Sequence, residues 1–196
     1  MRIGIDFDNT IVDYSKVFSL ISSELGWLPK STLNKSEIKA LIINTYNERK
    51  WTELQGHVYG DYIHLATPYK SSLDVVKKLI SDGHDIFIVS HKTRYPVIGD
   101  KVSLHDSARN WLKDNAFSPE LISFDNVSFH ATRDEKIKKI ESLSLDFFID
   151  DLEEVLLDDN WPSDTLAIHF SPYSKGSSNL KKINNWMSFM GFLKDV

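Results

Sequence analysis

Short apolar runs typical of buried β-strands recur along the chain, and stretches of helical periodicity separate them. The strand-type runs cover residues 2–6, 85–90, 146–150 and 165–170, with a weaker run near 127–129. Apolar residues recur every three or four positions over residues 73–80, 104–112 and 137–143. Because buried strands that alternate with helices form right-handed βαβ units, the pattern predicts an α/β fold with a doubly wound parallel sheet.

One long insertion interrupts this alternation. Residues 14–66 separate the first strand from the next βα unit, whereas such connections usually take about 2–6 residues. The insertion shows helical patterns over residues 17–25 and 38–46 and a polar-aromatic segment over 51–60. We therefore expect residues 1–13 and 67–196 to form the α/β core and residues 14–66 to form a small helical cap above the carboxyl ends of the strands.

The end of the chain carries an amphipathic pattern from Leu180 to Leu193. This spacing predicts a helix, which we expect to pack on the core; recruitment of a partner is the less favoured alternative.

Composition narrows the function classes. The 196 residues include 23 Lys and Arg against 28 Asp and Glu, a net charge of −5. This charge disfavours electrostatic binding to long nucleic acid or to an anionic membrane. The chain has no cysteine, which excludes disulfides, thiolate metal sites and cysteine nucleophiles. Asp6 precedes any apolar run of signal length, and no later run approaches the roughly 18 residues of a membrane span, so we expect a cytoplasmic protein.

Carboxylates follow two of the predicted strands. The first strand runs into Asp6-Phe7-Asp8-Asn9-Thr10, and the strand at 146–150 ends in Asp150-Asp151. Each motif alone is also compatible with an exposed acidic turn. If the two strands are neighbours, their carboxylates converge in the crevice where parallel sheets bind ligands. There they repel each other unless a cation joins them or one of them takes a proton. The pattern therefore favours a site with hard oxygen ligands, suited to Mg²⁺.

Two further polar residues stand at element ends. Ser90 ends the strand at 85–90, and Lys136 lies in the first turn of a helix that Thr132 begins. A lysine at a helix N-terminus opposes the helix dipole, which indicates an anion nearby. Taken singly, Ser90 could be a turn residue and Lys136 a solvated lysine.

The order of these motifs is more specific than any one of them. Asp-x-Asp-x-Thr at 6–10, Ser90, Lys136 and Asp150-Asp151 together resemble the haloacid dehalogenase-like (HAD) superfamily of phosphohydrolases over about residues 1–170. Members have a doubly wound sheet with a cap inserted after the first or the third strand. The segment 14–66 is similar to the first kind of cap, and the short stretch from Asp125 to Lys136 leaves no room for the second.

The resemblance implies roles for the site residues. Asp6 would be the nucleophile that forms an aspartyl-phosphate, and Asp8 would protonate the leaving oxygen and then activate water. Thr10 would fix the loop after the first strand, while Ser90 and Lys136 would hold phosphoryl oxygens.

The resemblance also implies a metal site. Asp6, the main-chain carbonyl of Asp8, and one or both of Asp150 and Asp151 would hold Mg²⁺. The Asp-Asp pair departs from the commoner Gly-Asp form, so the choice between Asp150 and Asp151 stays open.

Candidates for recognising the rest of the substrate follow Ser90 or lie in the insertion. His91, Lys92 and Arg94 would place positive charge at the mouth of the acidic site, with a solvated loop as the alternative. Trp51 and Gln55 would line the inner face of the cap, unless the aromatic residues there form the cap's own small core.

Together these features predict a Mg²⁺-dependent phosphatase acting on a small phosphorylated metabolite, a sugar phosphate or a nucleotide. A nucleotidase or nucleic-acid-end phosphatase is the alternative among enzymes. Outside enzymes, a phospho-accepting receiver would carry its aspartate on a middle strand of the chain, and an inactive binding relative would lack catalytic groups that are present here.

Overall fold

The computed structural model describes residues 1–172 and 180–194, and the chain divides into two compact units. Unit 1 comprises Met1–Val12, Pro68–His91 and Ala116–Val196, and unit 2 comprises Asp13–Thr67 and Lys92–Asn115.

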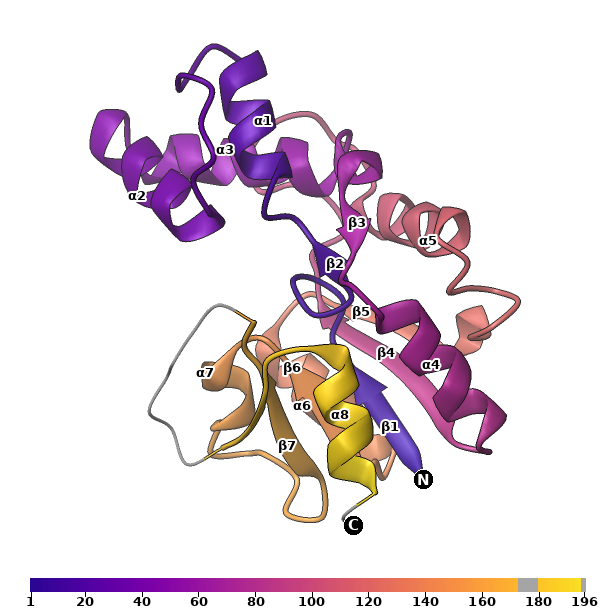
Figure 1. The fold of residues 1–196 in the computed structure, drawn as a ribbon. Coiled ribbons are helices and arrows are strands. Elements are labelled where there is room, and N and C mark those ends of the chain that lie inside the picture. Colours follow the sequence, from indigo (N-terminus) through magenta and orange to yellow (C-terminus); the bar gives the residue numbers. More distant parts are fainter. Residues whose placement is uncertain (173–179, 195–196) are drawn as a thin grey trace. The chain divides into compact units, whose positions relative to one another are not determined.

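Unit 1 is built on a six-stranded sheet with the order β5-β4-β1-β6-β7-β8 (Figure 1). The strands are β1 (Arg2–Ile5), β4 (Asp85–His91), β5 (Val127–His130), β6 (Phe147–Asp150), β7 (Leu166–Phe170) and β8 (Lys181–Ile183). Every neighbouring pair is parallel, which confirms the predicted doubly wound α/β fold. Ile5 of β1 pairs with Ile149 of β6, so the strands that precede the two carboxylate motifs are neighbours.

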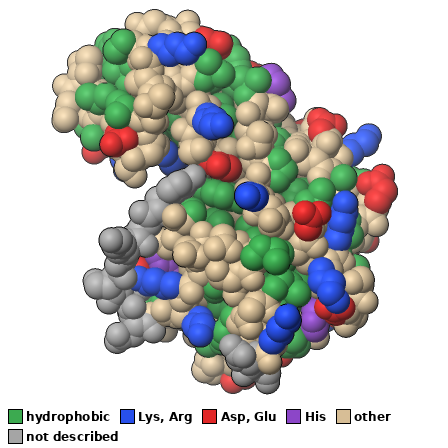
Figure 2. All heavy atoms as spheres, in the orientation of Figure 1, with side chains coloured by type: hydrophobic (Ala, Val, Ile, Leu, Met, Phe, Trp, Pro, Cys, Tyr) green, Lys and Arg blue, Asp and Glu red, His purple; other side chains and the backbone are tan. Residues whose placement is uncertain are grey.

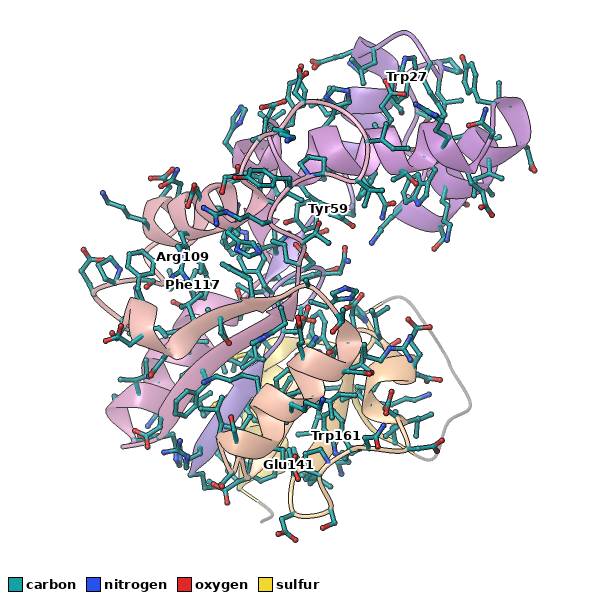
Figure 3. The ribbon with its side chains drawn as sticks, turned by 180° about the vertical axis from the view of Figure 1, so that it is seen from behind. Trp27, Tyr59, Arg109, Phe117, Glu141 and Trp161 are labelled. Atoms are coloured by element: carbon teal, nitrogen blue, oxygen red, sulfur yellow. The ribbon has the colours of Figure 1, made fainter. Side chains whose placement is uncertain are left out.

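Helices cover both faces of this sheet (Figures 1 and 3). On one face lie α4 (Ser72–Ser81) and α8 (Trp186–Leu193), and on the other lie α6 (Arg133–Ser142) and the short α7 (Glu153–Leu156). Successive residues of β6 serve the two faces, as the period of a strand requires. The Phe147 ring lies 6.3 Å from the Phe189 ring of α8, whereas the Phe148 ring lies 5.9 Å from the Trp161 ring on the α6 side.

The first strand is packed closely against its neighbour at Gly4. Gly4 pairs with Phe148, and a Cβ atom at Gly4 would collide with the side chains of Phe148 and Leu145. The absence of a side chain therefore lets β6 fill the α6 face of the core directly beside β1.

Unit 2 is helical, apart from its part of a two-stranded sheet formed by β2 (Val12–Asp13) and β3 (Thr67–Pro68). Its helices are α1 (Val17–Glu24), α2 (Lys35–Thr45), α3 (Glu48–Tyr59), a 3₁₀ turn (Ile63–Leu65) and α5 (Leu104–Asp114). The segment 92–115, which the sequence pattern groups with the core, belongs to this unit. One reason is Trp111 of α5, a buried residue whose Nε1 donates a hydrogen bond to the carbonyl of Ala66 at 2.9 Å.

The carboxyl-terminal part differs from the expected single helix. Residues 181–183 form β8, and the helix begins only at Trp186, with the Asn185 side chain accepting a hydrogen bond from the Ser188 amide. The helix prediction is wrong for this first part because β8 pairs with β7, a contact that local spacing does not encode.

Charged side chains of both signs are interspersed over the face of the described residues shown in Figure 2. None of the described helices combines the length and apolar character needed to cross a membrane.

Candidate active site

A buried lysine joins the two carboxylate motifs. Lys136 Nζ donates hydrogen bonds to Asp6 Oδ1 and to Asp150 Oδ2, each at 2.6 Å. The three residues are 1%, 4% and 0% exposed, respectively, so the contacts are shielded from water. Because charge-assisted bonds are strongest where water is excluded, this bridge fixes the ends of β1 and β6 relative to α6.

The first turn of α6 explains the placement of Lys136. Thr132 and Glu135 form a complete capping box, in which the Thr132 side chain accepts from the Glu135 amide and the Glu135 carboxylate accepts from the Thr132 amide. His91, at the end of β4, bonds through Nε2 to the carbonyl of Ala131 at 3.0 Å. The start of α6 is therefore fixed on both sides. The alternative that Lys136 is a solvated lysine is wrong, because its side chain is buried.

Burial and charge perturb the ionisation of this cluster. The pKa of Asp6 is raised to about 7: burial is the largest cause, the charges of Asp150 and Asp8 raise it as well, and the nearby Lys136 ammonium lowers it. Burial alone would lower the pKa of Lys136, but the carboxylates of Asp150 and Asp6 outweigh it and the pKa is raised. The single positive charge of Lys136 therefore does not balance the negative charges of the carboxylates around it.

The same carboxylates are arranged to hold a metal ion. Asp6, Asp150 and Asp151 each place one carboxylate oxygen within 4.8 Å of the other two. Asp150 is also held by the amide of Leu152, which donates to its Oδ1 at 2.9 Å. Three oxygens at this spacing, with charge that Lys136 leaves unbalanced, fit a hard divalent cation. The structure brings both Asp150 and Asp151 into this group.

The loop after β1 is held by its main chain. The amides of Ile11 and Val12 both donate to the carbonyl of Phe7 at 3.1 Å, and Trp186 Nε1 donates to the carbonyl of Thr10 at 3.1 Å. Asn9 takes a left-handed conformation with φ of 59°. The buried Thr10 hydroxyl has no hydrogen-bond partner among the described residues, so the observed anchor of Thr10 is its carbonyl.

Asp8 and Ser90 belong to the same edge of the sheet. Asp8 is partly buried in the loop after β1, two residues beyond Asp6. Ser90 is buried near the end of β4, the strand that pairs with the other side of β1. Both therefore lie at the carboxyl ends of the neighbouring strands β1 and β4, on the edge of the sheet where the cluster lies.

The predicted substrate-binding residues divide between the units. The ring of His91, in unit 1, bonds to Ala131 as described above. Lys92 is only 4% exposed and places Nζ 4.8 Å from the centre of the Tyr59 ring, so Lys92 does not belong to a solvated loop. Arg94 is exposed beside the Tyr95 ring.

The two cap residues have different surroundings. Trp51 is buried and stacked on Phe18, with ring centres 5.0 Å apart, which favours the alternative that it belongs to the core of unit 2. Gln55 is half-buried on α3. The role of these residues in substrate binding stays a prediction.

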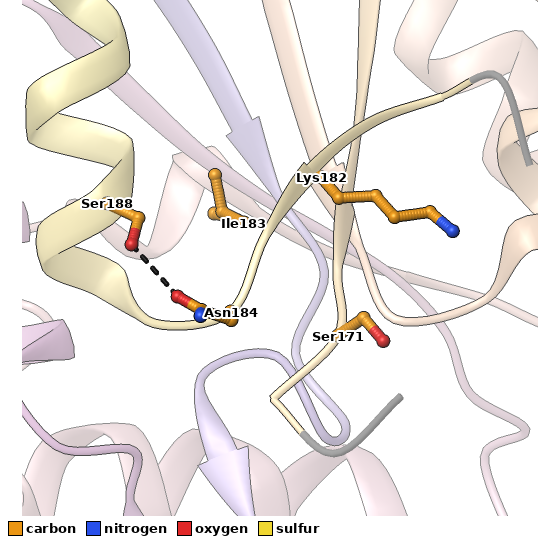
Figure 4. Close-up of a pocket in the computed structure, with 5 residues that line it drawn as sticks. All are labelled: Ser171, Lys182, Ile183, Asn184 and Ser188. Atoms are coloured by element: carbon orange, nitrogen blue, oxygen red, sulfur yellow. Dashed lines mark hydrogen bonds between the residues drawn. The ribbon is translucent and has the colours of Figure 1, made fainter. Parts of the chain in front are cut away.

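The sequence pattern gave no sign of a polar pocket beside β7, β8 and α8. Its volume is about 250 Å³, and its lining residues are Ser171, Lys182, Ile183, Asn184 and Ser188 (Figure 4). Within it, the Ser188 hydroxyl donates to Asn184 Oδ1 at 3.0 Å. The pocket could not be predicted because β8 itself was expected to be helical.

Comparison with known proteins gives distant relatives that extend over nearly the whole chain. No protein-family model matches. A protein of Oceanobacillus iheyensis named "Putative nucleotidase OB0422" is 25% identical over 199 residues, which cover 97% of this chain and 97% of the relative. A "Putative nucleotidase" of Bacillus cereus is 21% identical over 206 residues, covering 99% of this chain and 98% of the relative.

Solved structures show which fold this is. A predicted phosphatase from Clostridium acetobutylicum has a TM-score of 0.64 at 14% identity, covering 100% of this chain and 98% of its own. The "putative HAD-hydrolase YfnB" from Bacillus subtilis, in a form bound to magnesium, has a TM-score of 0.61 at 11% identity, covering 98% and 97%. The chain has the fold of the HAD-superfamily hydrolases, which confirms the fold that the resemblance of the four motifs implies.

Proposed function

We propose that this protein is a Mg²⁺-dependent phosphoric monoester hydrolase that works through an aspartyl-phosphate on Asp6. The observation that carries the proposal is the bridge from Lys136 to Asp6 and Asp150, with the Asp151 carboxylate beside it, at the carboxyl edge of a HAD-type sheet. In an open parallel sheet this edge is where ligands bind.

The residues divide the reaction into two displacements. In the first, a carboxylate oxygen of Asp6 attacks phosphorus, the ester P–O bond breaks, and Asp8 gives its proton to the leaving oxygen. In the second, Asp8 takes a proton from water, the water oxygen attacks phosphorus, and the Asp6 carboxylate leaves as inorganic phosphate forms. Both groups return to their starting protonation states.

The other residues stabilise the charge that moves. Lys136 and Ser90 would bind the phosphoryl oxygens during both displacements. Asp6, Asp150, Asp151 and the main-chain carbonyl of Asp8 would hold Mg²⁺, which supplies positive charge next to the phosphoryl group.

A nucleoside monophosphate is the substrate class we favour, with a sugar phosphate as the alternative. The names of both curated relatives support a nucleotidase, and the net charge of −5 disfavours long nucleic acid as the substrate. A receiver function is disfavoured because Asp6 follows the first strand of the chain, and an inactive relative is disfavoured because each of the expected acid, base and phosphate-binding groups is present.

The test is turnover of a panel of phosphate esters by Asp6→Asn, with Asp159→Asn as the control. Asp6→Asn keeps the shape of the site but removes the attacking oxygen, so turnover should fall by several orders of magnitude on every ester. Asp159 is exposed in the same unit, and its replacement should leave turnover unchanged. If Asp6→Asn retained more than about a tenth of the activity, Asp6 would not be the nucleophile.

The intermediate can be tested separately with Asp8→Asn. An ester with a good leaving group, such as p-nitrophenyl phosphate, reacts without an acid, whereas hydrolysis of the intermediate still needs the base. Mass spectrometry should therefore detect one phosphoryl group on Asp6 in this variant. Its absence, with release of p-nitrophenol intact, would contradict the covalent route.

A further inference from the structure

A buried histidine lies directly beside the proposed metal site, yet the proposed chemistry does not use it. His169 of β7 pairs in register with Asp150 of β6 and is 6% exposed. Its Nε2 lies 3.1 Å from the main-chain carbonyl oxygen of Asp151. Because a carbonyl oxygen only accepts hydrogen bonds, Nε2 carries the ring proton and donates a hydrogen bond to the Asp151 carbonyl.

The other side of the ring faces charged groups. His169 Nδ1 lies 3.1 Å from Glu153 Oε1, and the same oxygen lies 3.3 Å from Lys182 Nζ. Glu153 begins α7 two residues after Asp151, and Lys182 belongs to β8. Neither His169 Nδ1 nor Lys182 Nζ makes a hydrogen bond among the described residues, so the Nε2 bond to Asp151 is the hydrogen bond that orients the ring.

The bond from His169 bears on how Asp151 is held beside Asp150. The Asp150 side chain is fixed by Lys136 and by the Leu152 amide, and Asp151 follows it directly after β6, where it is partly exposed. The direction in which a carboxylate points depends on where its main chain lies, so a bond to that main chain helps to aim the side chain. The bond from His169 is a main-chain anchor of this kind, made from a neighbouring strand.

We infer that His169 is a positioning residue, which holds the main chain of Asp151 so that its carboxylate faces Asp6 and Asp150. The inference rests on the proposed Mg²⁺ site. Groups that orient metal ligands typically contribute about 10–100-fold to metal affinity, and this sets the size of the expected effect. A merely structural histidine, by contrast, would lower stability and leave the Mg²⁺ dependence unchanged.

The experiment compares His169→Leu with His169→Gln in the full chain. Leucine fills similar space without a donor, whereas the glutamine amide can reach the position of Nε2 and donate to the same carbonyl. Thermal unfolding is recorded across a Mg²⁺ titration at pH 8, and turnover is measured over the same series. His84→Leu serves as the control because His84 precedes β4, at the opposite edge of the sheet.

The Mg²⁺ midpoint of the melting-temperature shift should rise about tenfold or more in His169→Leu and return to within a few-fold of wild type in His169→Gln. Turnover at saturating Mg²⁺ should stay close to wild type in both. If His169→Leu does not fold, His169→Asn takes its place, since its shorter amide cannot reach the carbonyl.

Two results would overturn the inference, and they differ from failure of the proposed function. Equal midpoints for wild type and the donor-free variant would assign His169 a structural role only. If the Mg²⁺ midpoint rose equally in His169→Leu and His169→Gln, the hydrogen bond would not be the cause of the effect. If wild type itself showed no Mg²⁺ shift, the proposed metal site would fail first.

Discussion

Replacement of Lys136 by methionine isolates the charge balance of the site. Methionine has nearly the length of lysine and is apolar, so the core keeps its packing while the ammonium group is lost. Asp6 and Asp150, which Lys136 bridges at 2.6 Å, then face each other in a buried position without their shared counter-ion. We expect a large loss of stability in the metal-free protein.

The magnitude follows from the burial of the pair. Removing one partner of a buried ion pair costs about 3–5 kcal/mol, and each kcal/mol lowers the melting temperature of a chain of this size by about 2–4 °C. The melting temperature in EDTA at pH 8 should therefore fall by about 6–20 °C.

The loss should depend on pH with a definite sign. A carboxyl group with a raised pKa contributes stability below its unfolded value and loses that contribution as pH rises through its folded value. For Asp6 this window runs from 3.8 to about 7 in the wild type. Without Lys136 the pKa of Asp6 rises further, because the attraction that lowers it is gone. The deficit should therefore be largest at pH 8 and smaller at pH 5.

The assay is thermal unfolding followed by circular dichroism in EDTA at pH 5 and pH 8. Lys138→Met is the matched control, since Lys138 is exposed on the same helix and should change the melting temperature little at either pH. A deficit of equal size at the two pH values would refute the reasoning and assign Lys136 a packing role.

Three further predictions concern the metal, the loop and the core. Mg²⁺ should raise the melting temperature of the wild type more at pH 8 than at pH 5, because protons compete for Asp6, and EDTA should abolish turnover; a melting curve unchanged across millimolar Mg²⁺ would reject the shared site. Trp186→Phe removes the buried donor to the Thr10 carbonyl and should cost about 1–3 kcal/mol in urea unfolding as well as lowering kcat; unchanged kcat would separate this bond from the active loop. Gly4→Ala should cost about 1–3 kcal/mol by overpacking, whereas Gly191→Ala, with open space around it in α8, should be neutral or stabilising; equal effects in urea unfolding would contradict the close packing of β1 on β6.

The sequence pattern is most informative where structure is decided locally. The strands at 2–5, 85–91 and 147–150 are buried on both faces. Each therefore appears in the sequence as a short, largely apolar run. The edge strand β8 has three residues, and the first is exposed. Its extended state depends on pairing with β7, so a helical spacing in the same residues was misleading.

In the site, too, some features follow from local sequence and others depend on tertiary contacts. Asp6, Asp150 and Lys136 could be predicted to converge because the carboxyl ends of parallel strands meet at one edge and a capping box fixes where α6 begins. His169 and Trp186 could not be predicted, because each acts by a bond from its side chain to a distant main-chain carbonyl. Such bonds depend on strand register and helix placement, and no local spacing marks them.

The charge count of the cluster explains why a divalent cation suits it. Three carboxylates, those of Asp6, Asp150 and Asp151, carry −3 when ionised, and Lys136 carries +1, which leaves −2. One divalent cation balances this charge, whereas a monovalent cation leaves the site negative towards an incoming phosphate. Burial is the main cause of the raised pKa of Asp6, and the negative charge of Asp150 adds to it, so a proton on Asp6 partly offsets the excess in the absence of metal. In the proposed mechanism, the imbalance that would destabilise the metal-free protein would therefore also couple binding of the cation to binding of an anionic substrate.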